Sequence, residues 1–169
     1  MTCIQKIFLF LLILFPVVGN SFAQERGFSW GALGSSGNMG REFSSVNLES
    51  YAGYNFTPNF SAYLKAETDV ILLKKEEVEK HYPSQALGVL LKYNVYKFSS
   101  GIFDLRAGTG TNLRSDDWRY LYWDMGFFLQ ATREITKPTI GLVFRYYNTL
   151  EKGEKNYPSV YVSVGFTVN

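Results

Sequence analysis

Apolar and polar residues alternate with a period of two along most of the chain. In the segment 121–131, Trp123 and Phe127 fall on one face and Asp124 falls on the other. Successive side chains of a β-strand point to opposite faces, so this alternation predicts a strand with one apolar face. Similar segments bounded by turn residues recur, and the sequence predicts strands at 27–34, 43–56, 60–72, 84–96, 101–112, 119–132, 139–149 and 158–168.

The predicted connections alternate in length. Those at 57–59, 97–100 and 133–138 are compact, and those at 35–42, 73–83, 113–118 and 150–158 are mostly longer and rich in Gly, Asn and charge. We expect the charged stretch 72–81 to be a solvated loop, with a short helix as the alternative. An antiparallel meander with short turns at one end and longer loops at the other is typical of an outer-membrane barrel. Eight strands then place both termini at the short-turn, periplasmic end.

The distribution of charge indicates which face lies inside. No charge falls in the middle of the apolar face, where Arg or Lys facing lipid would cost about 2–4 kcal/mol. Most strand glycines share the charged face, as expected for the crowded inside of a narrow barrel. We therefore predict an all-β fold, an eight-stranded antiparallel up-and-down transmembrane β-barrel, and a soluble barrel is the alternative. The predicted lumen charges are Glu49, Lys65, Glu67, Asp69, Lys92, Asp104, Arg106, Asp124 and Arg145.

The first residues have the features of a secretory signal. Lys6 precedes an apolar run from Ile7 to Val18, and Ser21 and Ala23 supply the small residues of a cleavage site. The run is shorter than the roughly 20 residues of a spanning helix, which is the alternative interpretation. We expect residues 1–23 to be cleaved and 24–169 to form a single barrel domain.

Composition narrows the possible functions. The sequence carries a net charge of +2, and removal of Lys6 with the signal leaves +1, too little for a nucleic-acid-binding surface. The single cysteine, Cys3, leaves with the signal, so the mature chain has no disulfide. One histidine, no mature cysteine and no acidic loop of calcium spacing predict neither a metal site nor a cofactor.

The mature chain resembles the small eight-stranded outer-membrane barrels of Gram-negative bacteria, of the OmpX-like and OmpA-transmembrane-domain type. The resemblance covers the whole mature chain and includes the last alternating segment, 160–168. It implies a location in the outer membrane, contact with its lipids, and insertion by the outer-membrane assembly machinery. Members usually end on an outward aromatic residue, whereas here Phe166 stands in the alternate register before Thr167, Val168 and Asn169.

The predicted lumen contains five acidic and four basic residues, so its charges nearly balance. An ion-pair network that fills and closes the lumen is the favoured interpretation, because eight strands leave no room for a wide aqueous pore. A polar channel or an ion path is the alternative.

Two groups of residues near the longer loops could carry other activities. Some small outer-membrane barrels modify lipid A with Ser, His and acidic side chains, for which the candidates are His81, Ser84, Ser115, Asp116 and Asp117. No known motif of such enzymes accompanies them, and we expect no catalysis. A mixture of Tyr, Trp and Arg also suits an interface, and possible rim contacts are Arg114, Trp118, Arg119 and Tyr120. The favoured interpretation of these residues is an interfacial girdle whose loop charges contact lipid headgroups.

The sequence therefore predicts a small outer-membrane barrel, favoured as a monomer, with a structural or accessory role in the envelope. A barrel that modifies or binds outer-leaflet lipid through its rim loops is the first alternative. A soluble periplasmic ligand-binding barrel is the second.

Overall fold

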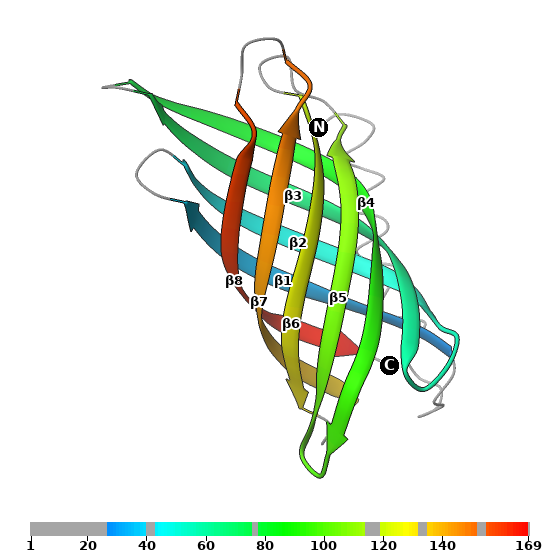
Figure 1. Ribbon diagram of the computed structural model, residues 1–169. Coiled ribbons are helices and arrows are strands. Elements are labelled where there is room, and N and C mark those ends of the chain that lie inside the picture. The colour runs from blue at the N-terminus through cyan, green and yellow to red at the C-terminus, as the bar shows by residue number, and fades with distance from the viewer. Residues whose placement is uncertain are drawn as a thin grey trace.

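The computed structural model describes residues 27–39, 43–75, 78–113, 119–131, 135–151 and 155–168. They form eight strands, and each strand pairs antiparallel with its neighbours in sequence. Pairing of the first strand with the last closes the sheet, which confirms the predicted eight-stranded barrel (Figure 1). The strands are β1 (Gly27–Met39), β2 (Phe43–Asn55), β3 (Phe60–Lys75), β4 (Val78–Phe98), β5 (Gly101–Asn112), β6 (Tyr120–Ala131), β7 (Thr136–Thr149) and β8 (Tyr157–Val168).

The predicted signal segment 1–23 lies outside the described residues. In the described part of the chain, no helix is long and apolar enough to cross a membrane.

The apolar side chains of the strands point away from the barrel axis. Leu64 is 72% exposed, Leu48 is 60% exposed and Phe127 is 54% exposed. A soluble barrel buries such side chains inside, whereas a membrane barrel turns them toward lipid. The exterior is therefore suited to a hydrocarbon solvent and argues against the soluble barrel.

The interior holds two clusters of buried aromatic and aliphatic side chains, with Val143 packed against both. The cluster toward the longer loops consists of Ile71, Ala86, Tyr120, Tyr122, Tyr147 and Tyr161. The cluster toward the short turns consists of Leu33, Tyr51, Tyr63, Leu90 and Phe128.

The prediction of a charged loop at 72–81 is wrong. Strands β3 and β4 continue their ladder to the pair Lys75 and Val78, and they extend beyond their neighbours at the long-loop end (Figure 1). Backbone hydrogen bonds hold an antiparallel ladder together whatever the polarity of the side chains, so a charged hairpin can extend into water. The loop expected at 35–42 also shrinks, because β1 runs to Met39 and β2 begins at Phe43.

Prolines that suggested turns lie inside strands. Pro138 pairs with Phe166 near the start of β7, in a stretch that we expected to be part of a turn. Pro83 lies in β4 beyond the end of β5, since the pairing with β5 starts at Ala86. Proline cannot donate to a ladder, and both positions are near a strand end or an open edge where fewer donors are required.

Glycine lets one bulky side chain fill the interior. The ring of Phe128 lies across Gly141 on the neighbouring strand, and a Cβ at Gly141 would overlap that ring. A Cβ at Gly126 would also approach the Phe128 ring, to 2.8 Å. Phe128 is 2% exposed, so these two glycines provide the space in which it packs.

We predict that Gly141→Ala lowers the free energy of unfolding by about 1–3 kcal/mol, because the added methyl group overpacks the Phe128 ring. The matched control is Gly34→Ala, where a Cβ would contact only the carbonyl oxygen of Val164, at 3.9 Å. Urea titration of the folded protein in detergent measures both variants. Adding Phe128→Leu should offset part of the loss, and an equal effect of both alanines would contradict this packing.

Candidate functional site

The lumen is the candidate site, since the structure places all nine predicted lumen charges inside the barrel. Each of these side chains belongs to a residue that is at most 6% exposed. Their positions follow from strand alternation, since they share the inward face with the strand glycines. Charges at this depth must be paired, because an unpaired buried ion costs several kcal/mol.

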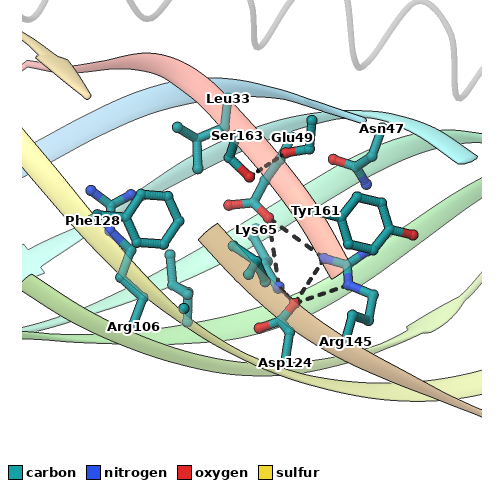
Figure 2. Close-up of a pocket in the computed structure, with 14 residues that line it drawn as sticks. Leu33, Asn47, Glu49, Lys65, Arg106, Asp124, Phe128, Arg145, Tyr161 and Ser163 are labelled. Carbon is teal, nitrogen blue, oxygen red and sulfur yellow. Dashed lines mark hydrogen bonds and ion pairs between the residues drawn. The ribbon is translucent and has the colours of Figure 1, made fainter. Parts of the chain in front are cut away.

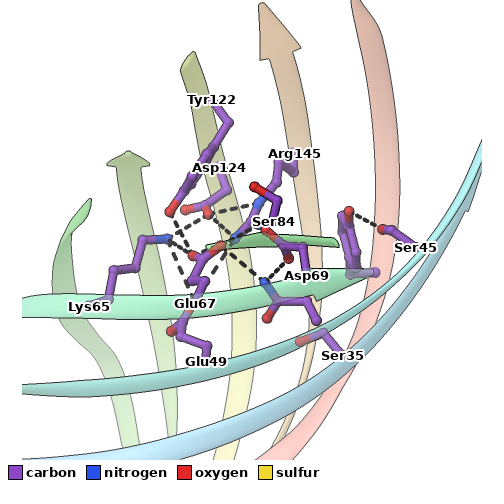
Figure 3. Close-up of polar contacts among 12 residues, drawn as sticks. Ser35, Ser45, Glu49, Lys65, Glu67, Asp69, Ser84, Tyr122, Asp124 and Arg145 are labelled. Atoms are coloured by element: carbon purple, nitrogen blue, oxygen red, sulfur yellow. Dashed lines mark hydrogen bonds and ion pairs between the residues drawn. The ribbon is translucent and has the colours of Figure 1, made fainter. Parts of the chain in front are cut away.

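Arg145 on β7 is the centre of the main network (Figure 3). Its Nη1 and Nη2 atoms donate to the two carboxylate oxygens of Glu67, at 2.7 and 2.9 Å. Its Nη2 also donates to Asp124 Oδ2, at 2.7 Å. A planar guanidinium satisfies two carboxylates in this way with fixed geometry, so Arg145 joins β3, β6 and β7 across the lumen.

Lys65 provides the second positive charge of the same network. Its Nζ lies 2.8 Å from Asp124 Oδ2 and 3.0 Å from Glu67 Oε1. Glu49 is more loosely held, with Oε2 at 3.6 Å from Lys65 Nζ and 3.9 Å from Arg145 Nη2. We call Glu49, Lys65, Glu67, Asp124 and Arg145 the central cluster.

Polar side chains complete the hydrogen bonding around the central cluster. Tyr122 donates to Glu67 at 2.7 Å, and Tyr120 donates to Asp69 Oδ2 at 3.0 Å. The Asn47 amide donates to both Glu67 and Asp69. Asp69 is therefore held by neutral donors beside the cluster.

Tyrosine rings also cover the buried cations. The Arg145 guanidinium lies 4.1 Å from the centre of the Tyr122 ring, and Lys65 Nζ lies 4.8 Å from it. Cation–π contact of this kind is worth about 2 kcal/mol where water is excluded. Tyr122 was not among the predicted site residues, although it shares the face of Asp124, and this shared face was the available signal.

A second network lies toward the short turns. Arg106 Nε donates to Asp104 Oδ1 at 2.7 Å, and its guanidinium stacks 4.0 Å from the centre of the Phe128 ring. Lys92 Nζ lies 3.8 Å from Asp104 Oδ2 and donates to Gln130 Oε1 at 2.9 Å. Asp104 is therefore shared between two cations on β4 and β5.

The two networks meet at a small cavity of about 20 Å³ (Figure 2). Glu49 and Arg145 line it from the central cluster, and Arg106 and Phe128 line it from the other side. A space of this size holds about one water molecule. Within the described residues, no group of three or more His, Cys, Asp or Glu side chains could hold a metal ion.

The candidate lipid-modifying residues are not assembled in the described part of the chain. Ser84 points into the lumen, where its Oγ lies 3.1 Å from the Tyr120 hydroxyl. His81 lies in β4, for which only the backbone is described at this position, and 115–117 lie outside the described residues.

Two of the four predicted rim contacts, Arg119 and Tyr120, lie within the described residues. Arg114 and Trp118 lie outside the described residues, and Arg119 is exposed. Tyr120 is 0% exposed, so its assignment to the rim is wrong. It alternates in phase with Tyr122 and Asp124, and this phase turns its ring into the lumen.

We predict that Arg145→Ala lowers the free energy of unfolding by about 3–5 kcal/mol, because it leaves the carboxylates of Glu67 and Asp124 buried without their main partner. Arg145→Lys keeps the charge but loses the bidentate contact, so it should lower the free energy of unfolding by a smaller amount. Urea titration in detergent measures both, with the exposed Arg119→Ala as the control. Equal stability of the Arg145→Ala and Arg119→Ala proteins would contradict this account.

Comparison with known proteins identifies the fold. No protein-family model matches the chain, and no curated protein matches it. Among solved structures, the crystal structure of Neisserial surface protein A (NspA) is similar, with a TM-score of 0.57 and 15% sequence identity. The match covers 88% of this chain and 99% of that one. The chain therefore has the fold of the small eight-stranded outer-membrane β-barrels.

Proposed function

We propose that this protein is a non-enzymatic outer-membrane barrel of a Gram-negative bacterium, monomeric, with a closed lumen and a structural or accessory role in the envelope. The observation that carries the proposal is the filled interior. Arg145, Lys65 and their carboxylate partners cross the lumen at its centre, where their side chains are at most 8% exposed. Because ion pairs fill the cross-section of the lumen, we infer that the protein makes its contacts through the outer surface of the barrel.

The exterior supports outer-membrane lipid as the principal partner. Trp123 stacks on Tyr146 toward the long-loop end, with ring centres 5.7 Å apart. Tyr54, Phe56 and Phe60 make ring contacts toward the short-turn end. Aromatic girdles at both ends of an apolar band are typical of barrels that sit in a bilayer.

The arrangement of the connections supports an orientation with both termini in the periplasm. The first and last described residues lie at the end of the barrel where β2 joins β3 and β4 joins β5 by short turns (Figure 1). Short turns face the periplasm in barrels of this type, and insertion would use the outer-membrane assembly machinery.

The lumen chemistry supports a closed barrel without catalysis. The cavity between the two networks holds about one water molecule, and Arg145, Lys65 and Phe128 line its walls. Ser84, the one lipid-modifying candidate with a described side chain, is 5% exposed and faces Tyr120. We therefore propose that the barrel neither conducts ions at a measurable rate nor modifies lipid A.

Fractionation of native envelopes tests the location. We expect the protein in the outer-membrane fraction, with faster gel migration before heating than after, because a folded barrel stays compact in detergent. A control sample unfolded in urea should migrate like the heated one. Recovery of the protein in the soluble periplasmic fraction without a heat shift would overturn the proposal and favour the soluble barrel.

Planar-bilayer recording tests the closed lumen. The purified wild-type protein should give no steady single-channel current, because Arg145, Lys65 and their partners block the path. A general porin inserted into the same bilayer provides the positive control. Regular current steps from the wild-type protein would show that the interior conducts and would contradict the closed lumen.

A further inference from the structure

Charge is unevenly distributed along the lumen. The central cluster together with Asp69 contains four carboxylates against the two cations Lys65 and Arg145. Toward the short turns the imbalance is reversed. Asp104 is the only carboxylate of the described residues at that end, and Arg106 binds both of its oxygens, at 2.7 and 3.3 Å.

Three lysines remain at the short-turn mouth after Arg106 has neutralised Asp104. Lys92 is 6% exposed and lies inside the barrel. Lys97 pairs across the ladder with the buried Ile102, and Lys137 pairs with the buried Thr167. Directly paired residues of an antiparallel sheet point to the same side, so Lys97 and Lys137 have the inward orientation of their partners.

The inward orientation of Lys97 depends on a bulge in β4. The ladder between β4 and β5 shifts its register between Asn94 and Tyr96. An extra residue reverses the alternation, which turns Tyr96 outward with Phe103 and Lys97 inward with Ile102. A bulge that re-aims a side chain is a recurring device at barrel rims.

Gln130 adds a hydrogen-bond donor among these lysines. It pairs with Ile102 on one side and with Thr139 on the other, so it lies on the same rung as Lys97. Its Oε1 accepts from Lys92 Nζ at 2.9 Å. The residue is only 2% exposed, so its Nε2 is buried, yet this atom donates to no acceptor of the described residues. A buried amide donor beside an excess of positive charge is complementary to an anion.

We propose that the short-turn mouth of the lumen binds a phosphate group, held by the ammonium groups of Lys92, Lys97 and Lys137 and by the Nε2–H of Gln130. A phosphate group offers several acceptor oxygens. It also supplies the negative charge that is needed to balance these cations beyond the single charge of Asp104. Phe128 and Arg106, which contact each other, line the cavity on the side opposite the carboxylates of the central cluster (Figure 2).

The phosphate group could belong to a free oxyanion or to a phospholipid headgroup, and the recognising chemistry is the same. Binding in detergent does not depend on where the protein resides in the cell. Failure of this inference and failure of the proposed function are therefore distinguishable.

Phosphate titration of the folded, full-length mature protein in an uncharged detergent tests the site. Inorganic phosphate replaces chloride at constant ionic strength, and two-dimensional NMR follows the side-chain amide of Gln130. We expect saturable shifts in that amide. The double variant Lys97→Gln/Lys137→Gln should weaken the apparent affinity about tenfold or more, because it removes two charge-assisted hydrogen bonds.

Lys155→Gln is the matched control, because Lys155 is exposed near the opposite end of the barrel. It should leave the phosphate affinity unchanged. Linear shifts without saturation, or equal losses in the control and in the double variant, would overturn the proposal, since both indicate a general ionic effect.

A vesicle experiment separates the two sources of the phosphate group. Wild-type protein is reconstituted into vesicles of digalactosyldiacylglycerol, an uncharged lipid without phosphate, with or without phosphatidylglycerol, and inorganic phosphate is titrated into both. Competition by the anionic lipid supports binding of a headgroup, and unchanged phosphate affinity supports a free oxyanion. Absence of any phosphate response in both vesicle types would overturn the site.

Discussion

Closure of eight strands into a ring is the constraint on which the rest of this structure depends. A ring of this size has an interior just wide enough for side chains to fill, so inward positions cannot be left to water. Arg145 meets Glu67 and Asp124 because three strands bring them to the same level of a narrow lumen. The same narrowness requires glycine opposite Phe128, where a larger residue would overlap the ring.

The two faces of the barrel wall require opposite kinds of side chain, apolar on the outside and polar on the inside. On the outer face, Leu64 and Phe127 expose apolar side chains. Inside, burial of charge would be costly without the partners that neighbouring strands supply. Because adjacent residues of one strand face the two sides, each strand meets both demands along its whole length. The interior is also polarised, with an acidic centre and a basic mouth at the short-turn end.

The sequence was sufficient for the architecture because alternation carries the same information in every strand. Asp124 and Arg145 could be assigned to the lumen from their phase alone. Which charges pair could not be predicted, because pairing depends on the stagger between strands, and no local pattern reveals it. The charged tip of β3 and β4 was misjudged for a related reason. Side-chain polarity suggested a loop, but the ladder depends on backbone groups that the pattern of charges does not report.

The hairpin of β3 and β4 determines how far the barrel projects at its long-loop end. From Val78 to Ser84, β4 pairs with β3 and has no partner on β5, because that pairing begins at Ala86. The distance by which this hairpin projects beyond the closed ring is therefore set by the length of its strands and not by the length of a loop. Two residues added to each strand would move the tip outward by about 7 Å without altering the closed ring below. Strand length in this hairpin thus sets how far the long-loop end projects, while the closed ring below stays constant.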